Sequence, residues 1–376
     1  SVLTSRYFGA GEYQELKQSV RTALTAFLVL SLCLGLFGWF LAPQIMTALN
    51  TPADVLAQAI VYLRIYFLGL PFLFLYNVFS AMFNALGRSK IPLFLLIFSS
   101  VFNVLLDLVM VCYFGLGIAG VAWATLIAQG ISAVLSFLLF QKEMTSYQTE
   151  TVTAWFVSSQ FVRMSKLALP SILQQSTVSI GMMLVQSVVN GFGTEMLAGF
   201  SAAMRVESLC VVPMAAMGNV ISAYTAQNLG ARQLERVKQG YHAGYGIVFI
   251  IALLLCLLLE LSYRPLIALF LGEEGTALAL QTGSSYLQFM GCFFVLIGLK
   301  MITDGLLRGA GHMLPFTIAN LVNLGLRVAV AMLFAPRFGI AMVWVAVPIG
   351  WLVNYVISFM AYRTEKWRQI RYETGM

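Results

Sequence analysis

The stretches "TSRYFGAGEYQELKQS" (residues 4–19) and "TAQNLGARQLERVKQG" (residues 225–240) state one pattern twice, 221 residues apart. Each stretch leaves an apolar run, passes a Gly-Ala pair, carries Lys-Gln at the same place and enters another apolar run. Such a match indicates an internal repeat in which each copy is a connector between two helices.

The repeat continues beyond this connector. "GIAGVAWA" (117–124) returns as "GIAMVWVA" (339–346), and "SSVFNVLLD" (99–107) aligns with "ANLVNLGLR" (319–327). The second alignment places Asn103 over Asn323. The chain therefore consists of two related parts.

Composition indicates the medium in which these parts fold. Of the 376 residues, 60% are apolar and 10% are charged, whereas soluble domains carry about a quarter charged residues. Apolar runs of about 20 residues, long enough to cross the hydrocarbon core of a bilayer, recur throughout the chain. The sequence predicts an all-α polytopic membrane protein, and Pro43, Pro265 and Pro336 are among the residues expected at helix ends. The ten predicted spans cover residues 20–41, 55–84, 91–114, 117–140, 167–191, 196–226, 241–261, 280–307, 313–335 and 339–361.

Positive charge predicts the orientation. If the connector that holds Gly9 is cytoplasmic, sixteen Lys and Arg residues lie in cytoplasmic loops and the C-terminal tail, against Arg264 and Arg337 outside. This positive-inside bias predicts a multi-pass protein of the plasma (inner) membrane with a cytoplasmic C-terminus. The net charge of +7 is then a signal of topology, so the bilayer is an expected partner. Nucleic acid is not, and no obligatory protein partner is expected.

The two parts have the same orientation. Between Gly9 and Gly230 the chain crosses the membrane six times, and an even number of crossings makes the parts parallel repeats. The polar connector 141–166 separates an N-terminal lobe (1–150) from a C-terminal lobe (151–376). The C-terminal lobe has six predicted spans, and the N-terminal lobe has four plus the end of a fifth. The repeat therefore predicts two further spans before Ser1.

Several segments resemble the multidrug and toxic-compound extrusion (MATE) family of transporters. These segments are "YFGAGEYQELKQS" (7–19), "NVLLD" (103–107), Pro170-Ser171, "LGARQLERVKQG" (229–240) and "LRGAGH" (307–312). The resemblance implies twelve spans in two lobes and export of small organic cations by alternating access, with inward Na⁺ or H⁺ as coupling ion and no other cofactor. In some members the coupling acid is an Asp of the first span, which falls before this sequence. In others it is a Glu at the position of Val178.

A polar stripe follows the predicted span 167–191. Its members recur every three or four residues and so share one helix face. Because amides and hydroxyls are costly against lipid, the stripe is either a wall of the substrate cavity or a surface for helix packing. The substrate-binding candidates in it are Gln175, Ser179, Met182, Gln186 and Asn190.

A second stripe, in the predicted span 55–84, adds Tyr66 and Asn77 to the substrate-binding candidates. Pro71 lies within this span, and an internal proline kinks a helix. One hypothesis is that Pro71 helps to gate the cleft, and the alternative is a kink that serves packing alone.

Charged residues inside spans indicate functional or paired groups, because burying them unpaired is costly. Arg64 and Asp107 occur at similar depth on successive spans, which predicts a structural ion pair. Glu207 and Arg327 have a similar relation, which predicts a second one. Asp107 is in addition a candidate for cation coupling.

Lys300, Asp304 and Arg308 recur at i, i+4 and i+8 near the inner end of a span. A ladder of this kind can neutralise itself. Asp304 is nevertheless the second candidate for cation coupling, since it is an acid near the expected inner mouth of the cleft.

Together these patterns predict a cation-coupled secondary antiporter that exports cationic amphiphilic drugs. One alternative is a flippase for lipid-linked oligosaccharides, whose cavity would need several basic residues to bind a pyrophosphate. Another is a non-transporting remnant. An enzyme is not expected, and no metal site is, because both histidines lie near span ends and the five cysteines include no CxxC pair.

Overall fold

The computed structural model describes residues 1–49, 51–147, 149, 154–272 and 275–368. It divides into two compact units, one formed by Leu3–Met164 and the other by the chain from Ser165 onward. The division falls within helix α6 (Ser158–Asn190). The predicted lobe boundary at residues 150 and 151 lies outside the described residues.

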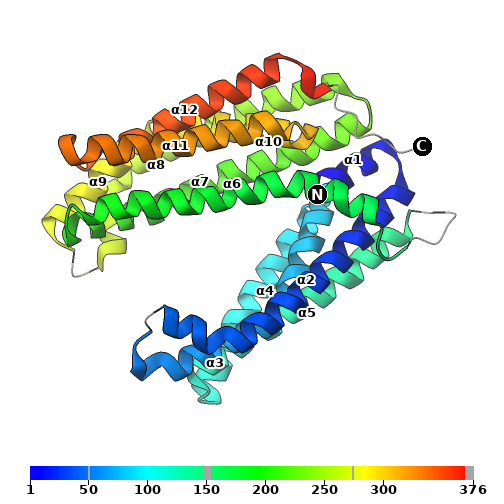
Figure 1. Ribbon diagram of the computed structural model, residues 1–376, viewed down its shortest axis with the longest axis horizontal. Coiled ribbons are helices and arrows are strands. Elements are labelled where there is room, and N and C mark those ends of the chain that lie inside the picture. Colours follow the sequence, from blue (N-terminus) through cyan, green and yellow to red (C-terminus); the bar gives the residue numbers. More distant parts are fainter. Residues whose placement is uncertain (50, 148, 150–153, 273–274, 369–376) are drawn as a thin grey trace. The chain divides into compact units, whose positions relative to one another are not determined.

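The first unit is a bundle of long helices preceded by a short one (Figure 1). Helix α2 packs against α3, and both α3 and α4 pack against α5. A π-helical turn, Val109–Tyr113, extends α4. The helices are α1 (Val2–Ala10), α2 (Tyr13–Ala48), α3 (Ala53–Ala85), α4 (Lys90–Leu108) and α5 (Gly117–Thr145).

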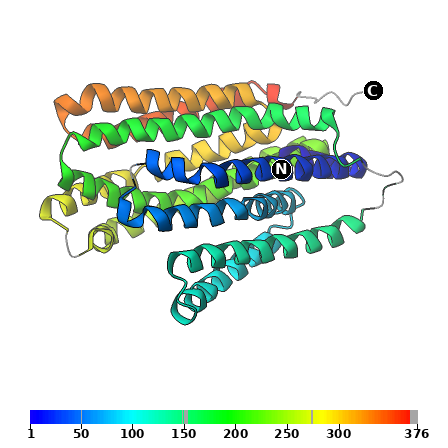
Figure 2. The same ribbon diagram turned by 60° about the horizontal axis from the view of Figure 1, so that its bottom comes forward.

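The second unit is built around α7, which contacts α8, α9 and α10, while α12 contacts α10 and α11. Helices α11 and α12 run side by side in both views (Figure 1 and Figure 2). Large apolar side chains such as Met214, Leu259 and Phe294 are buried between these helices. The helices that follow α6 are α7 (Thr194–Gly230), α8 (Leu234–Leu271), α9 (Ala277–Gly291), α10 (Phe294–Ala310), α11 (Met313–Phe338) and α12 (Ala341–Arg363).

The predicted all-α polytopic fold is confirmed. In the described part of the chain nine helices are long and apolar enough to cross a membrane, and the pair α9–α10 passes the same test as one broken span. The span predicted over 280–307 is therefore two helices, bent by 55° at Cys292 and Phe293. Large apolar side chains such as Phe37 and Leu254 are more than half exposed on the helix surfaces, as expected of groups that face lipid.

The prediction that Pro43, Pro265 and Pro336 end their helices is wrong. Helices α2, α8 and α11 each continue beyond the proline. Each proline removes one N–H to carbonyl hydrogen bond within the helix, which leaves the rest of the ladder in place. Neighbouring helices and small backbone adjustments also satisfy the groups that a proline frees within a membrane.

Four connectors use the same turn, in which the residue after the helix is left-handed. Gly11, Gly87, Arg232 and Gly311 have φ angles of 73°, 75°, 58° and 78°. In each turn this residue donates its N–H to the carbonyl three residues earlier, and the next N–H reaches five residues back. This is the Schellman arrangement, which satisfies carbonyls left over at a helix end. Gly11 and Arg232 are 221 residues apart, so the sequence repeat encodes one turn twice.

Helices α7 and α10 approach each other closely at glycines. A Cβ on Gly305 would lie 2.3 Å from the carbonyl oxygen of Gly218, and a Cβ on Gly309 would lie 2.2 Å from that of Ser222. Gly305 and Gly309 have the GxxxG spacing by which membrane helices bring their backbones together. The contact fixes which face of α10 is turned toward the rest of the unit.

Replacing Gly305 by alanine should destabilise the second unit by about 1–3 kcal/mol, because the new Cβ meets backbone rather than a flexible side chain. Thermal unfolding of the purified protein in detergent measures the effect. Gly325→Ala in α11 is the matched control, since a Cβ there meets no atom within 4 Å. Equal transition temperatures for the two variants would contradict the close-contact interpretation.

Candidate functional site

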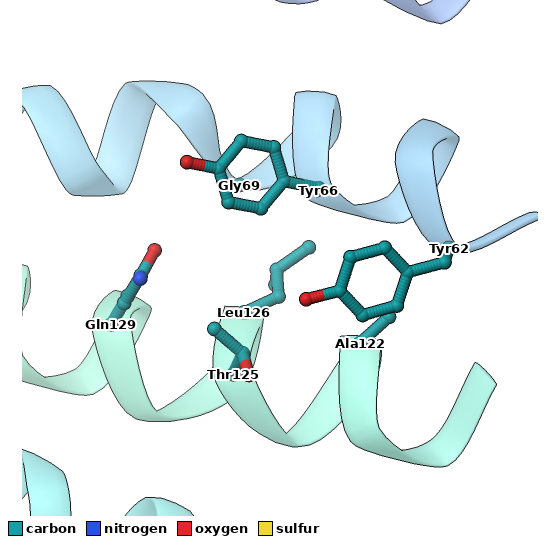
Figure 3. A pocket seen from close by; sticks show the side chains of 7 residues that line it. All are labelled: Tyr62, Tyr66, Gly69, Ala122, Thr125, Leu126 and Gln129. Carbon is teal, nitrogen blue, oxygen red and sulfur yellow. The ribbon is translucent and has the colours of Figure 1, made fainter. Parts of the chain in front are cut away.

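A small polar pocket lies between α3 and α5 in the first unit (Figure 3). Tyr62 and Tyr66 reach it from α3, and Thr125 and Gln129 reach it from α5. Its volume of about 10 Å³ is close to what one water molecule requires. Two phenols, a hydroxyl and an amide thus surround a space for one water or a small ion, with Gly69 and Leu126 also in its lining.

The same region of the first unit contains a half-buried acid. Asn103 on α4 donates its Nδ2–H to Thr125 Oγ1, 3.4 Å away, which joins α4 to the polar pocket. Asp107 lies one turn further along α4, on the same helix face. Its Oδ1 is buried and has no hydrogen-bond partner in the described residues. The π-helical turn starts two residues later, and such turns occur frequently at functional sites.

The predicted ion pair between Arg64 and Asp107 is not formed in the described residues. The guanidinium of Arg64 lies 5.0 Å from the centroid of the Trp39 ring, a cation–π contact. Its Nε–H is buried without a hydrogen-bond partner among the described residues. Arg64 and Asp107 were expected to be in contact because they lie at similar depth in the membrane. The rotation of α3 about its axis instead directs Arg64 to Trp39 of α2. In the part of the chain that the structure describes, Asp107 is thus left without the positive partner expected for it.

A second, larger cavity of about 320 Å³ also lies in the first unit. The candidate Asn77 lines it together with Phe27, Phe74 and Met82. The rings of Phe27 and Phe74 lie 6.1 Å apart between centroids. An aromatic pair, a thioether and an exposed amide form a surface that suits flat, amphiphilic molecules. Pro71 lies within α3 on the way between the two cavities, and α3 passes through it as one helix.

The polar stripe of α6 is only partly buried. Gln175, Ser179 and Asn190 are exposed, while Met182 and Gln186 are half-buried. The Ser179 hydroxyl donates to the carbonyl of Gln175 in its own helix. In the described residues no amide of this stripe hydrogen-bonds to another helix, and Met182 contacts Arg327 of α11 through its Sδ.

The predicted ion pair between Glu207 and Arg327 is also absent among the described residues. The buried carboxylate of Glu207 instead accepts a hydrogen bond from Tyr286 of α9. Arg327 directs its Nη2 to Met182 Sδ, 3.7 Å away. Helix α9 packs against α7, and Tyr286 provides the hydrogen bond that the arginine was expected to provide.

A fully buried polar cluster joins α10, α11 and α12 in the second unit. Lys300 Nζ lies 3.2 Å from Asp304 Oδ2 and donates to Asn320 Oδ1 at 3.0 Å. Asn320 returns a hydrogen bond to Asp304 Oδ2 at 3.1 Å, and Ser358 donates to Asp304 Oδ1 at 2.7 Å. Arg308, the third charge of the predicted ladder, instead contacts Asn219 and Ser222 of α7. Of the predicted ladder, Lys300 and Asp304 thus neutralise each other, and Arg308 does not take part.

Thr125 and Gln129 were not among the residues singled out from the sequence. The signal was present, because polar residues recur at spacings of 4, 3 and 4 in an otherwise apolar span: Thr125, Gln129, Ser132 and Ser136. Asn320 and Ser358 were not singled out either, although Asn320 recurs with Thr317 and Asn323 at spacings of three and Ser358 follows Asn354 by four. Spacing does not show that both contact Asp304, because that partner lies on another helix.

A helical membrane protein with polar pockets and buried acids within its spans has the architecture of a transporter. The model of the MatE family matches residues 1–109 and 170–333. The chain is 31% identical over 354 residues to the probable multidrug resistance protein YpnP of Bacillus subtilis, which covers 93% of this chain and 78% of YpnP. It is 28% identical over 373 residues to YoeA of the same organism, covering 96% and 80%.

Among solved structures, the outward-facing conformation of a multidrug resistance MATE family transporter has a TM-score of 0.89. The identity is 22%, and the match covers 98% of this chain and 83% of that one. The chain therefore belongs to the MatE family, with the MATE fold. It is a membrane transporter and not an enzyme, which confirms both predictions.

Replacing Tyr286 by phenylalanine should cost about 1–3 kcal/mol, because the buried Glu207 carboxylate loses its hydrogen-bond donor. Thermal unfolding in detergent measures this cost. Tyr263→Phe is the control, since the Tyr263 hydroxyl has no hydrogen-bond partner in the described part of the chain. If Glu207 were held by Arg327 after all, the two variants would unfold alike.

Proposed function

We propose that this chain exports small organic cations across the plasma membrane in exchange for Na⁺ or H⁺, by alternating access. Membership of the MatE family and the names of the two Bacillus relatives, both probable multidrug resistance proteins, support multidrug export. The properties of Asp107 support cation coupling.

The carrying observation is that Asp107 is an acid within a span whose buried Oδ1 lacks a partner in the described residues. Such a group is costly unless something neutralises it. Arg64 stacks on Trp39 instead of forming an ion pair with Asp107. A mobile cation, Na⁺ or a proton, can therefore provide the missing charge, with the amide of Asn103 and the hydroxyl of Thr125 beside it.

The two candidate acids differ in this respect. Asp304 already has the ammonium of Lys300 beside it and hydrogen bonds from two further helices. We therefore assign coupling to Asp107 rather than to Asp304.

Substrate contacts are proposed on both units. In the first unit, Asn77 and the aromatic pair of the larger cavity provide an amide and two rings, and rings attract organic cations through their negative faces. Tyr66 is proposed at the smaller pocket. In the second unit the exposed stripe of α6 provides Gln175, Ser179, Met182, Gln186 and Asn190. Pro71, between the two pockets on α3, is the proposed gating residue.

Replacing Asp107 by asparagine should lower gradient-driven efflux by about tenfold or more. The asparagine amide has no negative charge, so it cannot bind and release a coupling cation as the carboxylate would. The measurement is ethidium efflux from proteoliposomes under an imposed Na⁺ or H⁺ gradient. Glu260→Gln, at an exposed acid of α8, is the control and should keep full efflux.

Full activity of the asparagine variant would refute coupling through Asp107. Competition by a lipid-linked oligosaccharide but not by organic cations would instead favour a flippase.

The proposed orientation places the connector at Ser89 in the cytoplasm and the one at Leu116 outside, following the positive-inside bias. In a background with all five cysteines replaced by alanine, a membrane-impermeant maleimide should label Leu116→Cys in intact cells. Ser89→Cys should react only after permeabilisation. The opposite labelling pattern would reverse the orientation.

A further inference from the structure

The buried cluster around Asp304 has the composition of a cation site. The oxygens that face the ammonium of Lys300 are Asp304 Oδ2, at 3.2 Å, and Asn320 Oδ1, at 3.0 Å. Ser358 Oγ lies on the other carboxylate oxygen, at 2.7 Å. Carboxylate, amide carbonyl and hydroxyl oxygens are the ligands that small hard cations prefer. All four residues, Lys300, Asp304, Asn320 and Ser358, are at most 5% exposed.

We propose that the ammonium of Lys300 is a tethered cation that occupies a site for a small monovalent cation in the second unit. The ammonium is a compact point charge on a flexible stem, so it can stand where a bound ion would stand. Because the tether cannot leave, the site stays neutral without any ion from solution. Arg308, one turn further on, directs its guanidinium to Asn219 and Ser222 of α7 and leaves this position to Lys300.

The corresponding part of the first unit has no such pair. Counted back from the left-handed glycines of the two following turns, Gly311 and Gly87, Lys300 and Asp304 match Tyr76 and Ser80. The Tyr76 hydroxyl donates to the carbonyl of Pro92 at 3.4 Å. A charged pair was thus built into one repeat only, together with the Asn320 and Ser358 hydrogen bonds that stabilise it.

This proposal deepens the proposed function and rests on it in one respect. If Asp107 couples cation entry to export, the tethered ammonium keeps the second unit from binding a coupling ion as well. The site itself can be tested by binding alone, without transport, so the two proposals fail separately.

The test uses an Asp107→Asn background, so that the proposed coupling acid of the first unit cannot contribute, and compares the thermal stability of Lys300→Ala in sodium chloride and in choline chloride at equal ionic strength. Removing the side chain leaves both space and an unneutralised carboxylate, so sodium should raise the unfolding temperature by about 3 °C or more, as a ligand of the folded state does. Lys300→Met, whose methyl fills the space without charge, should show no sodium shift. Neither should the double variant Lys300→Ala/Asp304→Asn, which lacks the carboxylate.

The result that overturns the proposal is a Lys300→Ala protein that sodium does not stabilise. Failure of this variant to fold in either salt, while the double variant folds, has the same meaning, because no mobile cation then serves Asp304.

A second measurement uses variants that retain Lys300. Asp107→Asn should show no sodium shift, since the second unit is closed to ions. A sodium shift in this variant that disappears when Asp304→Asn is added would show that sodium binds beside Lys300, and the proposal would be wrong.

Discussion

The close approach of α7 and α10 at Gly218, Gly305 and Gly309 is the constraint on which the second unit depends. Lipid offers no driving force for helix association comparable to that of water, so small residues that let backbones meet are the main source of packing between membrane helices. With the glycine face of α10 against α7, the face that carries Lys300 and Asp304 is turned to α11 and α12. One apolar contact therefore decides where the charged residues of the unit lie.

Two aspartates illustrate how the surroundings of an acid decide its role. Asp107 and Asp304 both lie in membrane-spanning helices, where an isolated charge is costly. Asp304 is enclosed by an ammonium, an amide and a hydroxyl from three helices. Asp107 has a buried oxygen without a partner in the described residues and a polar pocket on the neighbouring helix. The charge of Asp304 is already balanced by Lys300, whereas Asp107 can accept a further positive charge.

Much of the fold could be predicted because hydropathy and the 221-residue repeat are linear features of the chain. The partners of Arg64 and Glu207 could not. Depth along a span follows from counting residues, but contact depends also on rotation about each helix axis, which packing decides. Tyr286 contacts Glu207 from α9, the part of the span that precedes the break, and this contact does not follow from counting residues. The break at Cys292 and Phe293 has one local signal in the sequence, Gly291 directly before it. The stripe of Thr125 and Gln129, in contrast, was open to prediction from spacing alone.

The turn at Arg232 shows how one position can carry two kinds of information. Left-handed backbone usually calls for glycine, as at Gly11 in the other repeat. Here two backbone hydrogen bonds hold the turn, and a long basic residue takes the place of glycine. The strain of that residue is of the order of 1 kcal/mol, while its charge is added to a loop at the very end of a helix. After a duplication, one copy of a turn can thus acquire a basic residue that contributes to membrane orientation, because backbone hydrogen bonds already stabilise the geometry of that turn.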